Sequence, residues 1–437
     1  MVARAGRLAQ GAPNSKGPHR VNETTDTSPP SKNRWRQIGP GIVVAATGVG
    51  AGDLVATLIA GSRYGYALLW AAILGCIVKI ALSEGSARYH LATGSTILAG
   101  WRSLGAWTSW YFGIYVLIWG FIYGATAMSA TALPLTALFP ILPLWGWAVF
   151  TGLTGFVFVW FNRYSTFELV MKIMVGVMFV VMVGLAILVA PTLPELASGL
   201  TFALPDGALF YTLGLIGGVG GTITTAAYGY WVQTKGWRGL GWLPLMRIDN
   251  ALAYTITGVF VIAMLIVGAE LLFSAGIALQ SSDRGLLGLS DVLAERFGRT
   301  IATLFLVGFA ATALSSVFGV WHGMSLFFAD WYRQVRGVEA EVGVETEKSL
   351  PFRAYLAWLT FPPMLLLFAQ QPFLLAVIYG AFGALFMPFL AITLLLLLNR
   401  RDLPEGARNG WLANVTLGGS ALLFVALAGQ QLWGLVG

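Results

Sequence analysis

The sequence predicts an all-α integral membrane protein that crosses the bilayer eleven times. Hydrophobic residue types make up 57% of the 437 residues and charged types only 10%, whereas a soluble domain carries about 25% charged residues. Apolar stretches of about 18 residues or more, long enough to cross roughly 30 Å of hydrocarbon, recur almost without pause from Ile38 on. These stretches lack the alternating pattern of barrel strands, so helices are the structure that satisfies their backbone in lipid.

The first 36 residues are expected to form a disordered, basic, cytoplasmic tail. They contain seven Lys or Arg residues against Glu23 and Asp26, with Pro, Ser, Asn and Thr between them. A signal peptide would place a hydrophobic stretch of roughly 7–15 residues soon after its positive charges, and none follows here.

The remaining chain is predicted to form a ten-helix core over 37–400, followed by a loop and an eleventh helix over 401–437. An arrangement of five plus five spans divides the core into inverted repeats at about 39–190 and 207–398. The eleven predicted spans are, in order, about 39–62, 66–90, 108–137, 145–162, 166–190, 207–233, 250–272, 298–328, 351–368, 371–398 and 411–436.

Basic residues between the spans predict the orientation in the cell membrane. With a cytoplasmic tail, the inside loops hold most of the Lys and Arg residues, which satisfies the positive-inside rule and places the C-terminus outside. The basic inside loops explain the formal net charge of +7, so this charge does not indicate a nucleic-acid partner. The basic residues of the inside loops are Arg102, Arg163, Lys235, Arg238, Arg247, Arg333, Arg336, Lys348, Arg400, Arg401 and Arg408.

Two of the predicted spans are interrupted by glycine-rich runs, Thr47–Asp53 in the first span and Gly217–Thr222 in the sixth. They lie five spans apart, and because five is odd, the second half is inverted relative to the first. Paired broken helices in inverted repeats form the midplane site of many secondary transporters. We therefore expect unwinding near 48–53 and 217–222, with the two breaks facing each other. The alternative is that the glycines only allow close helix packing.

Asp53 is the only carboxylate in the first span and follows the glycine run directly. A charge at the centre of a spanning helix costs about 2.5–3.5 kcal/mol on insertion scales, so it normally faces a cavity or a partner. Asp53 is therefore the candidate metal ligand or proton-coupling group, although it could instead cap the second half-helix. The expected substrate or ion site consists of Gly50, Gly52, Asp53, Gly221, Thr222, Thr224 and Thr225.

Glu84 and His322 are further candidates, for a proton pathway. Glu84 precedes Arg88 by four residues, so an ion pair within the helix is the alternative interpretation, and His322 could equally be a packed, hydrogen-bonded histidine. The sequence contains no Walker motif, dinucleotide fingerprint or His-Glu-x-x-His motif. We accordingly expect no enzyme activity and no cofactor.

Several segments resemble the Nramp family of divalent-metal transporters. The segments are Ile38–Gly41, Ala60–Trp70, Ser86–Arg88 with Ala92–Gly94, Gly214–Gly217 with Val232–Gln233, and Leu314–Ser316. The resemblance extends over about 37–400 and implies a leucine-transporter-type fold, a metal-ion substrate and proton coupling.

The metal-binding motifs of that family are not retained. The family has Asp-Pro-Gly-Asn in the first break, where this chain has the run from Gly50 to Asp53, and Met-Pro-His in the sixth span, where it has Gly221, Thr222 and Ile223. Thioether and imidazole ligands favour transition ions, whereas carboxylate, hydroxyl and carbonyl oxygens suit Mg²⁺ or Ca²⁺. The resemblance therefore implies a divergent relative with selectivity for harder ions.

Three functions remain open at this point. The first is a proton-coupled secondary transporter of a divalent metal cation. The second is a cation-coupled symporter of a small organic solute such as an amino acid, whose carboxylate could bind the backbone N–H groups exposed at the breaks. The third is a sensor on the same fold that binds its ligand without transporting it.

Overall fold

The computed structural model describes residues 37–161, 164–189, 193–218, 220–273, 283–337, 344–368 and 372–436, and the predicted tail over 1–36 lies outside them. Throughout these residues the regular secondary structure is helical. The helices are α1 (Pro40–Gly48), α2 (Ala51–Tyr64), α3 (Leu69–Thr93), α4 (Ile97–Leu104), α5 (Ala106–Leu138), α6 (Leu144–Phe161), α7 (Tyr164–Leu188), α8 (Leu193–Ser198), α9 (Leu209–Gly218), α10 (Thr224–Thr234), η2 (Leu240–Trp242), α11 (Leu243–Gly268), η3 (Ala269–Phe273), α12 (Asp283–Phe297), α13 (Arg299–Val335), α14 (Val344–Glu347), α15 (Leu350–Thr360), α16 (Met364–Leu367), α17 (Pro372–Leu398), η4 (Glu405–Ala407) and α18 (Trp411–Val436).

The first and sixth predicted spans are both broken, which confirms the prediction from the glycine runs. Helix α1 ends at Gly48 and α2 begins at Ala51, while α9 ends at Gly218 and α10 begins at Thr224. The first break is shorter than predicted, because the chain is helical again from Ala51 and not only after residue 53.

The two breaks face each other so closely that no side chain fits between Gly48 and Gly220. A Cβ atom added to Gly48 would lie 2.4 Å from the carbonyl oxygen of Gly220, so only glycine fits there. Gly220 and Gly221 have φ angles of +75° and +85°, a region that residues with a side chain rarely adopt. Glycine is therefore required at these positions for the close approach and for the turn of the sixth span.

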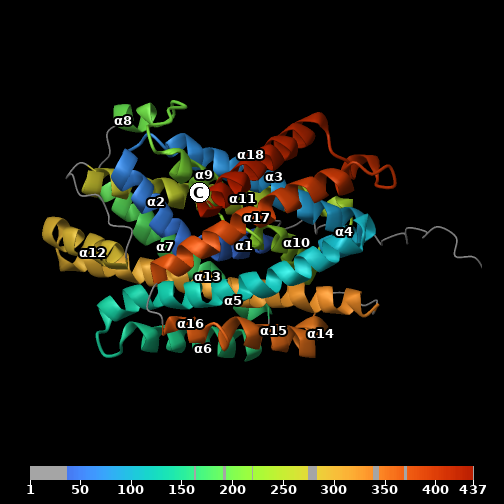
Figure 1. The fold of residues 1–437 in the computed structure, drawn as a ribbon, viewed down its shortest axis with the longest axis horizontal. Helices are drawn as coiled ribbons and strands as arrows, with labels where there is room; N and C mark the ends of the chain where they lie inside the picture. Colours follow the sequence, from blue (N-terminus) through green and yellow to red (C-terminus); the bar gives the residue numbers. More distant parts are fainter. Residues whose placement is uncertain are drawn as a thin grey trace, which may run out of the picture.

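Helices from both halves of the chain surround the breaks. Figure 1 shows α1 and α10 in the middle of the bundle, with α5 and α13 crossing on one side and α3 and α18 on the other. Helices α6, α15 and α16 lie along the outer edge beyond α5. The long helix α13 packs against both α1 and α10, so it contacts a half-helix of each broken span.

Seven of the described helical segments are long and apolar enough to cross a membrane. Two of the other predicted spans are the broken ones, and the last two correspond to α17 and α18, in each of which some side chains lie outside the described residues. The count of eleven spans therefore stays a prediction. The seven segments are Leu69–Thr93, Ala106–Leu138, Leu144–Phe161, Tyr164–Leu188, Leu240–Phe273, Arg299–Val335 and Leu350–Leu367.

Candidate ion and substrate site

A cavity lies at the two breaks. Backbone of both broken spans contributes to its wall, and α5, α13 and α17 complete it. All the polar side chains among its lining residues carry hydroxyls, and four of its apolar residues are alanine or valine. The lining residues are Thr47, Gly48, Gly50, Tyr123, Thr126, Ala127, Ala130, Gly221, Thr224, Ala313, Ser316, Val320 and Tyr379.

Helix α13 satisfies the backbone carbonyls at the end of α1. The Ser315 hydroxyl donates to the Ala46 carbonyl at 2.8 Å and the Ser316 hydroxyl donates to the Thr47 carbonyl at 2.9 Å. The last carbonyls of a helix have no partner within the helix, so the two serines stabilise this end of the first break. Ser316 also shares a hydrogen bond of 2.7 Å with the Tyr123 hydroxyl.

Aromatic rings form one wall of the cavity. Tyr123 stacks on Trp119 with the ring centroids 4.6 Å apart, and it meets the ring of Tyr379 edge-on at 5.0 Å. Both tyrosines line the cavity. This wall can exclude water and contact a ligand, and the tyrosine hydroxyls can accept or donate a hydrogen bond.

The second break brings one of the three predicted threonines to the cavity. Thr224 lines it, and its buried hydroxyl has no hydrogen-bond partner among the residues that the structure describes. The Thr222 hydroxyl is also buried without such a partner, but Thr222 packs against Gly383 of α17. Thr225 donates to the carbonyl of Gly221 at 3.4 Å. Thr224 is therefore the threonine placed to bind a ligand.

The structure places the other predicted residues of the breaks as follows. Gly50 and Gly221 line the cavity. Gly52 and Asp53 belong to the first turn of α2, and the Asp53 side chain lies outside the described residues. The role of Asp53 therefore stays a prediction.

Lys79 is a buried residue at the second break that the sequence analysis did not select. It comes from α3, and its ammonium group donates to the carbonyls of Gly217, at 2.9 Å, and of Gly221. Its position in the middle of a long apolar span was the available signal, since a charge there needs a polar partner.

Glu84 and His322, the two candidates for a proton pathway, are both engaged in contacts away from the cavity lining. Glu84 accepts from Arg88 and from Arg247 of α11, each at 3.0 Å. The alternative interpretation, an ion pair within the helix, thus describes its geometry. His322 accepts a hydrogen bond of 3.2 Å from Trp231 and lies 3.1 Å from the Glu347 carboxylate.

The buried carboxylate of Asp249 in α11 anchors the start of α1. It accepts from the backbone N–H groups of Gly39 and Gly41, at 3.0 and 2.6 Å, and from the Tyr228 hydroxyl of α10 at 2.8 Å. One carboxylate therefore joins the first span, helix α10 of the sixth span and α11.

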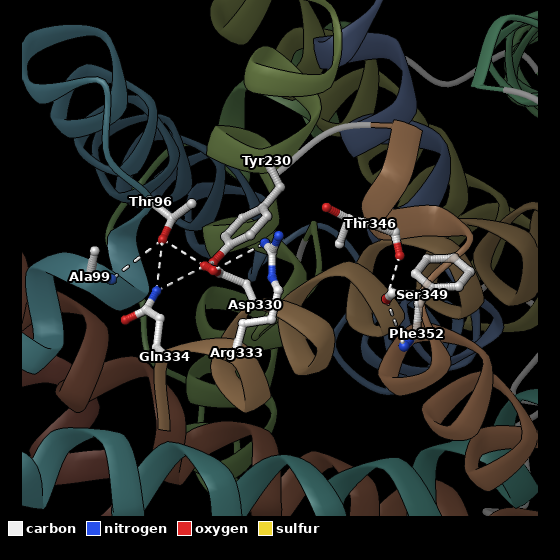
Figure 2. Close-up of polar contacts among 9 residues, drawn as sticks. All are labelled: Thr96, Ala99, Tyr230, Asp330, Arg333, Gln334, Thr346, Ser349 and Phe352. Atoms are coloured by element: carbon white, nitrogen blue, oxygen red, sulfur yellow. Dashed lines mark hydrogen bonds and ion pairs between the residues drawn. The ribbon is translucent and has the colours of Figure 1, made fainter. Parts of the chain in front are cut away.

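A second buried carboxylate, Asp330 of α13, also binds α10, through Tyr230. Figure 2 shows it accepting hydrogen bonds from Tyr230 of α10 and from Thr96, which caps α4. Gln334 and Arg333 approach the same carboxylate from the next turn of α13, at 3.1 and 3.5 Å. Helices α4, α10 and α13 are thus joined at one point.

Oxygen atoms dominate the chemistry that the described part of the cavity offers to a ligand. Among the described side chains, no group of three His, Cys, Asp or Glu residues is placed to hold a metal ion. The available donors are the hydroxyls of Thr224, Thr126 and the tyrosines, together with backbone groups of the breaks. Such donors suit hard cations, their water shells or polar organic ligands.

Two broken helices that meet at a central cavity, inside a bundle of apolar helices, define a secondary-transporter fold. The chain belongs to the Nramp family: residues 41–434 match the sequence model described as natural resistance-associated macrophage protein-like. This confirms the resemblance inferred from the sequence.

Individual relatives are distant in sequence. The divalent metal cation transporter MntH of Chromohalobacter salexigens is 29% identical over 208 residues, which are 44% of this chain and 46% of that protein, so the match spans about half of the relative. A crystal structure of a mutant Eremococcus coleocola manganese transporter shares the fold, with a TM-score of 0.77, 19% identity, and coverage of 95% of this chain and 91% of that one. MhsT in complex with L-phenylalanine also shares it, with a TM-score of 0.57, 15% identity, and coverage of 89% and 97%.

Proposed function

We propose that this protein is a secondary transporter that moves a divalent metal cation across the membrane with proton coupling. The observation that carries the proposal is the cavity between two facing helix breaks, in a chain that belongs to the Nramp family. The proposal includes eleven spans, with repeats at 39–190 and 207–398 that are inverted relative to each other. Alternating access would then expose the cavity to each side of the membrane in turn.

The donors at the breaks support selectivity for harder ions than manganese. Hydroxyl and carbonyl oxygens line the described cavity, and Asp53 would supply the negative charge. Magnesium prefers oxygen ligands and usually keeps several of its waters. The hydroxyls that line the cavity can bind the waters of a partly hydrated ion, so we propose that the cation is bound through water as well as through Thr224.

Flux measurements in proteoliposomes test this proposal. We expect uptake of Mn²⁺ that Mg²⁺ inhibits at similar concentrations, because no thioether or imidazole among the described residues lines the cavity and favours the softer ion. Acidification of the lumen, followed with an enclosed pH dye, should accompany metal uptake. Mn²⁺ uptake that a large excess of Mg²⁺ leaves unchanged would contradict the proposed selectivity, and unchanged lumenal pH would contradict proton coupling.

A small organic solute is the second candidate substrate, and the aromatic wall supports it. Tyr123 and Tyr379 offer rings and hydroxyls to a ligand, and aromatic surface with a few polar groups is typical of small-molecule sites. Uptake of labelled amino acids in metal-free buffer would favour this function. Ligand binding without any flux would favour the third function, a sensor.

A further inference from the structure

We propose that the ammonium group of Lys79 fills a monovalent-cation site at the break of the sixth span, so that the chain itself supplies the cation. This inference goes beyond the proposed transport of a divalent cation, because it concerns a second site with a different occupant. Lys79 is fully buried, at 0% exposure, in a span that is otherwise apolar around it. A lysine held there needs partners that replace its water shell.

Among the described residues, four structural elements supply such partners. The Lys79 ammonium donates to the carbonyl of Gly217 in α9, at 2.9 Å, and to the carbonyl of Gly221 in the break. The sulfur of Met387 in α17 lies 3.7 Å away, and the ring centroid of Phe424 in α18 lies 5.9 Å away. Carbonyl oxygens, a thioether and an aromatic face are all groups that attract a cation.

The break explains why these carbonyls are free to bind a cation. Helix α9 ends at Gly218, and the last carbonyls of a helix carry the negative end of its dipole without a partner inside the helix. Gly221 has a φ angle of +85° and lines the cavity, yet its carbonyl accepts from Lys79. Lys79 therefore donates hydrogen bonds to carbonyl oxygens that lack a partner within a helix because the span is unwound.

Neutral oxygen donors match a single positive charge. In transporters with broken helices, unwound carbonyls and the C-terminal ends of half-helices hold the coupling cation. Here the two carbonyls come from such an end and from such a segment, and a covalently attached ammonium occupies the position. We infer that this site needs no Na⁺ or K⁺ from solution as long as Lys79 is present.

Removing the ammonium should make the site open to a cation from solution. We would purify Lys79→Ala in detergent and measure its melting temperature in choline chloride, ammonium chloride, methylammonium chloride, sodium chloride and potassium chloride at equal ionic strength. The matched control is Lys172→Ala, which removes a partly exposed lysine that pairs with Glu168 at 2.6 Å. Because the readout is stability, it does not depend on which substrate the protein transports.

In choline, Lys79→Ala should melt about 5 °C or more below the wild type, because buried carbonyls lose their donor. Ammonium or methylammonium, or one of the alkali ions, should restore at least half of that difference in a saturable manner. The same salts should leave the wild type and the control unchanged. Equal melting in all salts, or equal gains in the control, would overturn the proposal.

A second variant tests whether the salts act at the vacated ammonium position or elsewhere in the protein. Lys79→Met fills the space with an apolar chain, so its melting temperature should be low in every salt, without restoration by ammonium. Restoration of Lys79→Met to the same extent as Lys79→Ala would show that the cations act elsewhere. If Lys79→Ala cannot be purified in choline, its yield in ammonium chloride becomes the readout, and failure in all five salts also overturns the proposal.

Discussion

Asp53 is the third residue of α2, immediately beyond the first break. A carboxylate in the first turn of a helix is stabilised by the positive end of the helix dipole, and a bound cation would stabilise its ionised form further. Burial of the carboxylate would act in the opposite direction. Cation binding and proton release should therefore be linked at this residue, which is the basis of its proposed role.

Asp53→Asn tests that role. We expect the variant to fold, because an amide oxygen can still accept a hydrogen bond at the start of α2, but to lose cation-dependent flux and its pH dependence. Flux between pH 5 and 8 at matched protein levels measures both. Asp402→Asn is the control, since it makes the same change at a side chain that is 62% exposed and should keep wild-type flux. Wild-type flux in Asp53→Asn would show that Asp53 is structural.

Thr224→Val tests the hydroxyl that the structure places in the cavity. Valine keeps the shape, and the hydroxyl has no partner among the described residues, so the melting temperature should change little. The apparent affinity for the transported cation should fall about five- to tenfold, as expected for the loss of one polar contact. The control is Thr312→Val, whose buried hydroxyl donates to its own helix at Gly308. Equal flux kinetics in both variants would remove Thr224 from the site.

The sequence predicted part of this site, and the reasons differ from residue to residue. Gly50, Gly221 and Thr224 could be selected because glycine runs and neighbouring hydroxyls are visible in the sequence, and all three line the cavity. Tyr123 could not be selected, because it reaches the cavity from α5 through a contact between distant parts of the chain. Lys79 carried a signal, as a charge in the middle of an apolar span, but the contact that brings it from α3 to the second break was not visible in the sequence. Packing between helices determines such contacts, and the patterns along a single sequence do not reveal which helices pack together.

At the scale of elements, the two breaks depend on each other. Gly48 ends α1 where Gly220 turns the chain of the sixth span, and their backbones are in contact. The glycine runs predicted both breaks, since glycine both weakens a helix and allows close approach. They did not predict where each helix resumes, because Gly52 is tolerated inside α2 once the surrounding helices hold it.

Gly48→Ala tests whether the contact between the breaks is required. The new methyl group would lie 2.4 Å from the Gly220 carbonyl oxygen, so the backbones must separate, at a cost of about 1–3 kcal/mol. We expect a lower melting temperature and a strong loss of flux. The matched control is Gly184→Ala in α7, where nothing lies within 4 Å of the added Cβ and where alanine should favour the helix. Unchanged flux in Gly48→Ala would show that the breaks work independently.

At the scale of the whole molecule, α10, the second half of the sixth span, connects the cavity to one end of the bundle. Helix α10 begins next to the cavity with Thr224, and three aromatic residues further along it bind buried polar side chains of α11 and α13. Tyr228 binds Asp249, Tyr230 binds Asp330, and Trp231 binds His322. These contacts join α10 to the surrounding helices on the side where the basic loops predict the cytoplasm. They should therefore stabilise the state in which that side is closed.

Tyr228→Phe tests this closure. It removes the hydroxyl that donates to Asp249 at 2.8 Å, while the N–H groups of Gly39 and Gly41 still bind the carboxylate. A hydrogen bond to a charged group is worth about 1.5–3 kcal/mol, which corresponds to roughly a tenfold or larger shift in a two-state equilibrium. The fraction of molecules open on that side should rise accordingly.

Labelling of one introduced cysteine measures the shift. Ala130→Cys places a thiol in the cavity wall, and Cys76→Ala removes the single native cysteine. In this background, Tyr228→Phe should raise the labelling rate several-fold for an impermeant thiol reagent added from the side of Lys235, and lower it from the opposite side. Tyr355→Phe, which removes a hydrogen bond between α15 and α5, should leave both rates unchanged. Equal changes from both sides would indicate loosened packing in place of alternating access, because only a shift between two states lowers one rate while it raises the other.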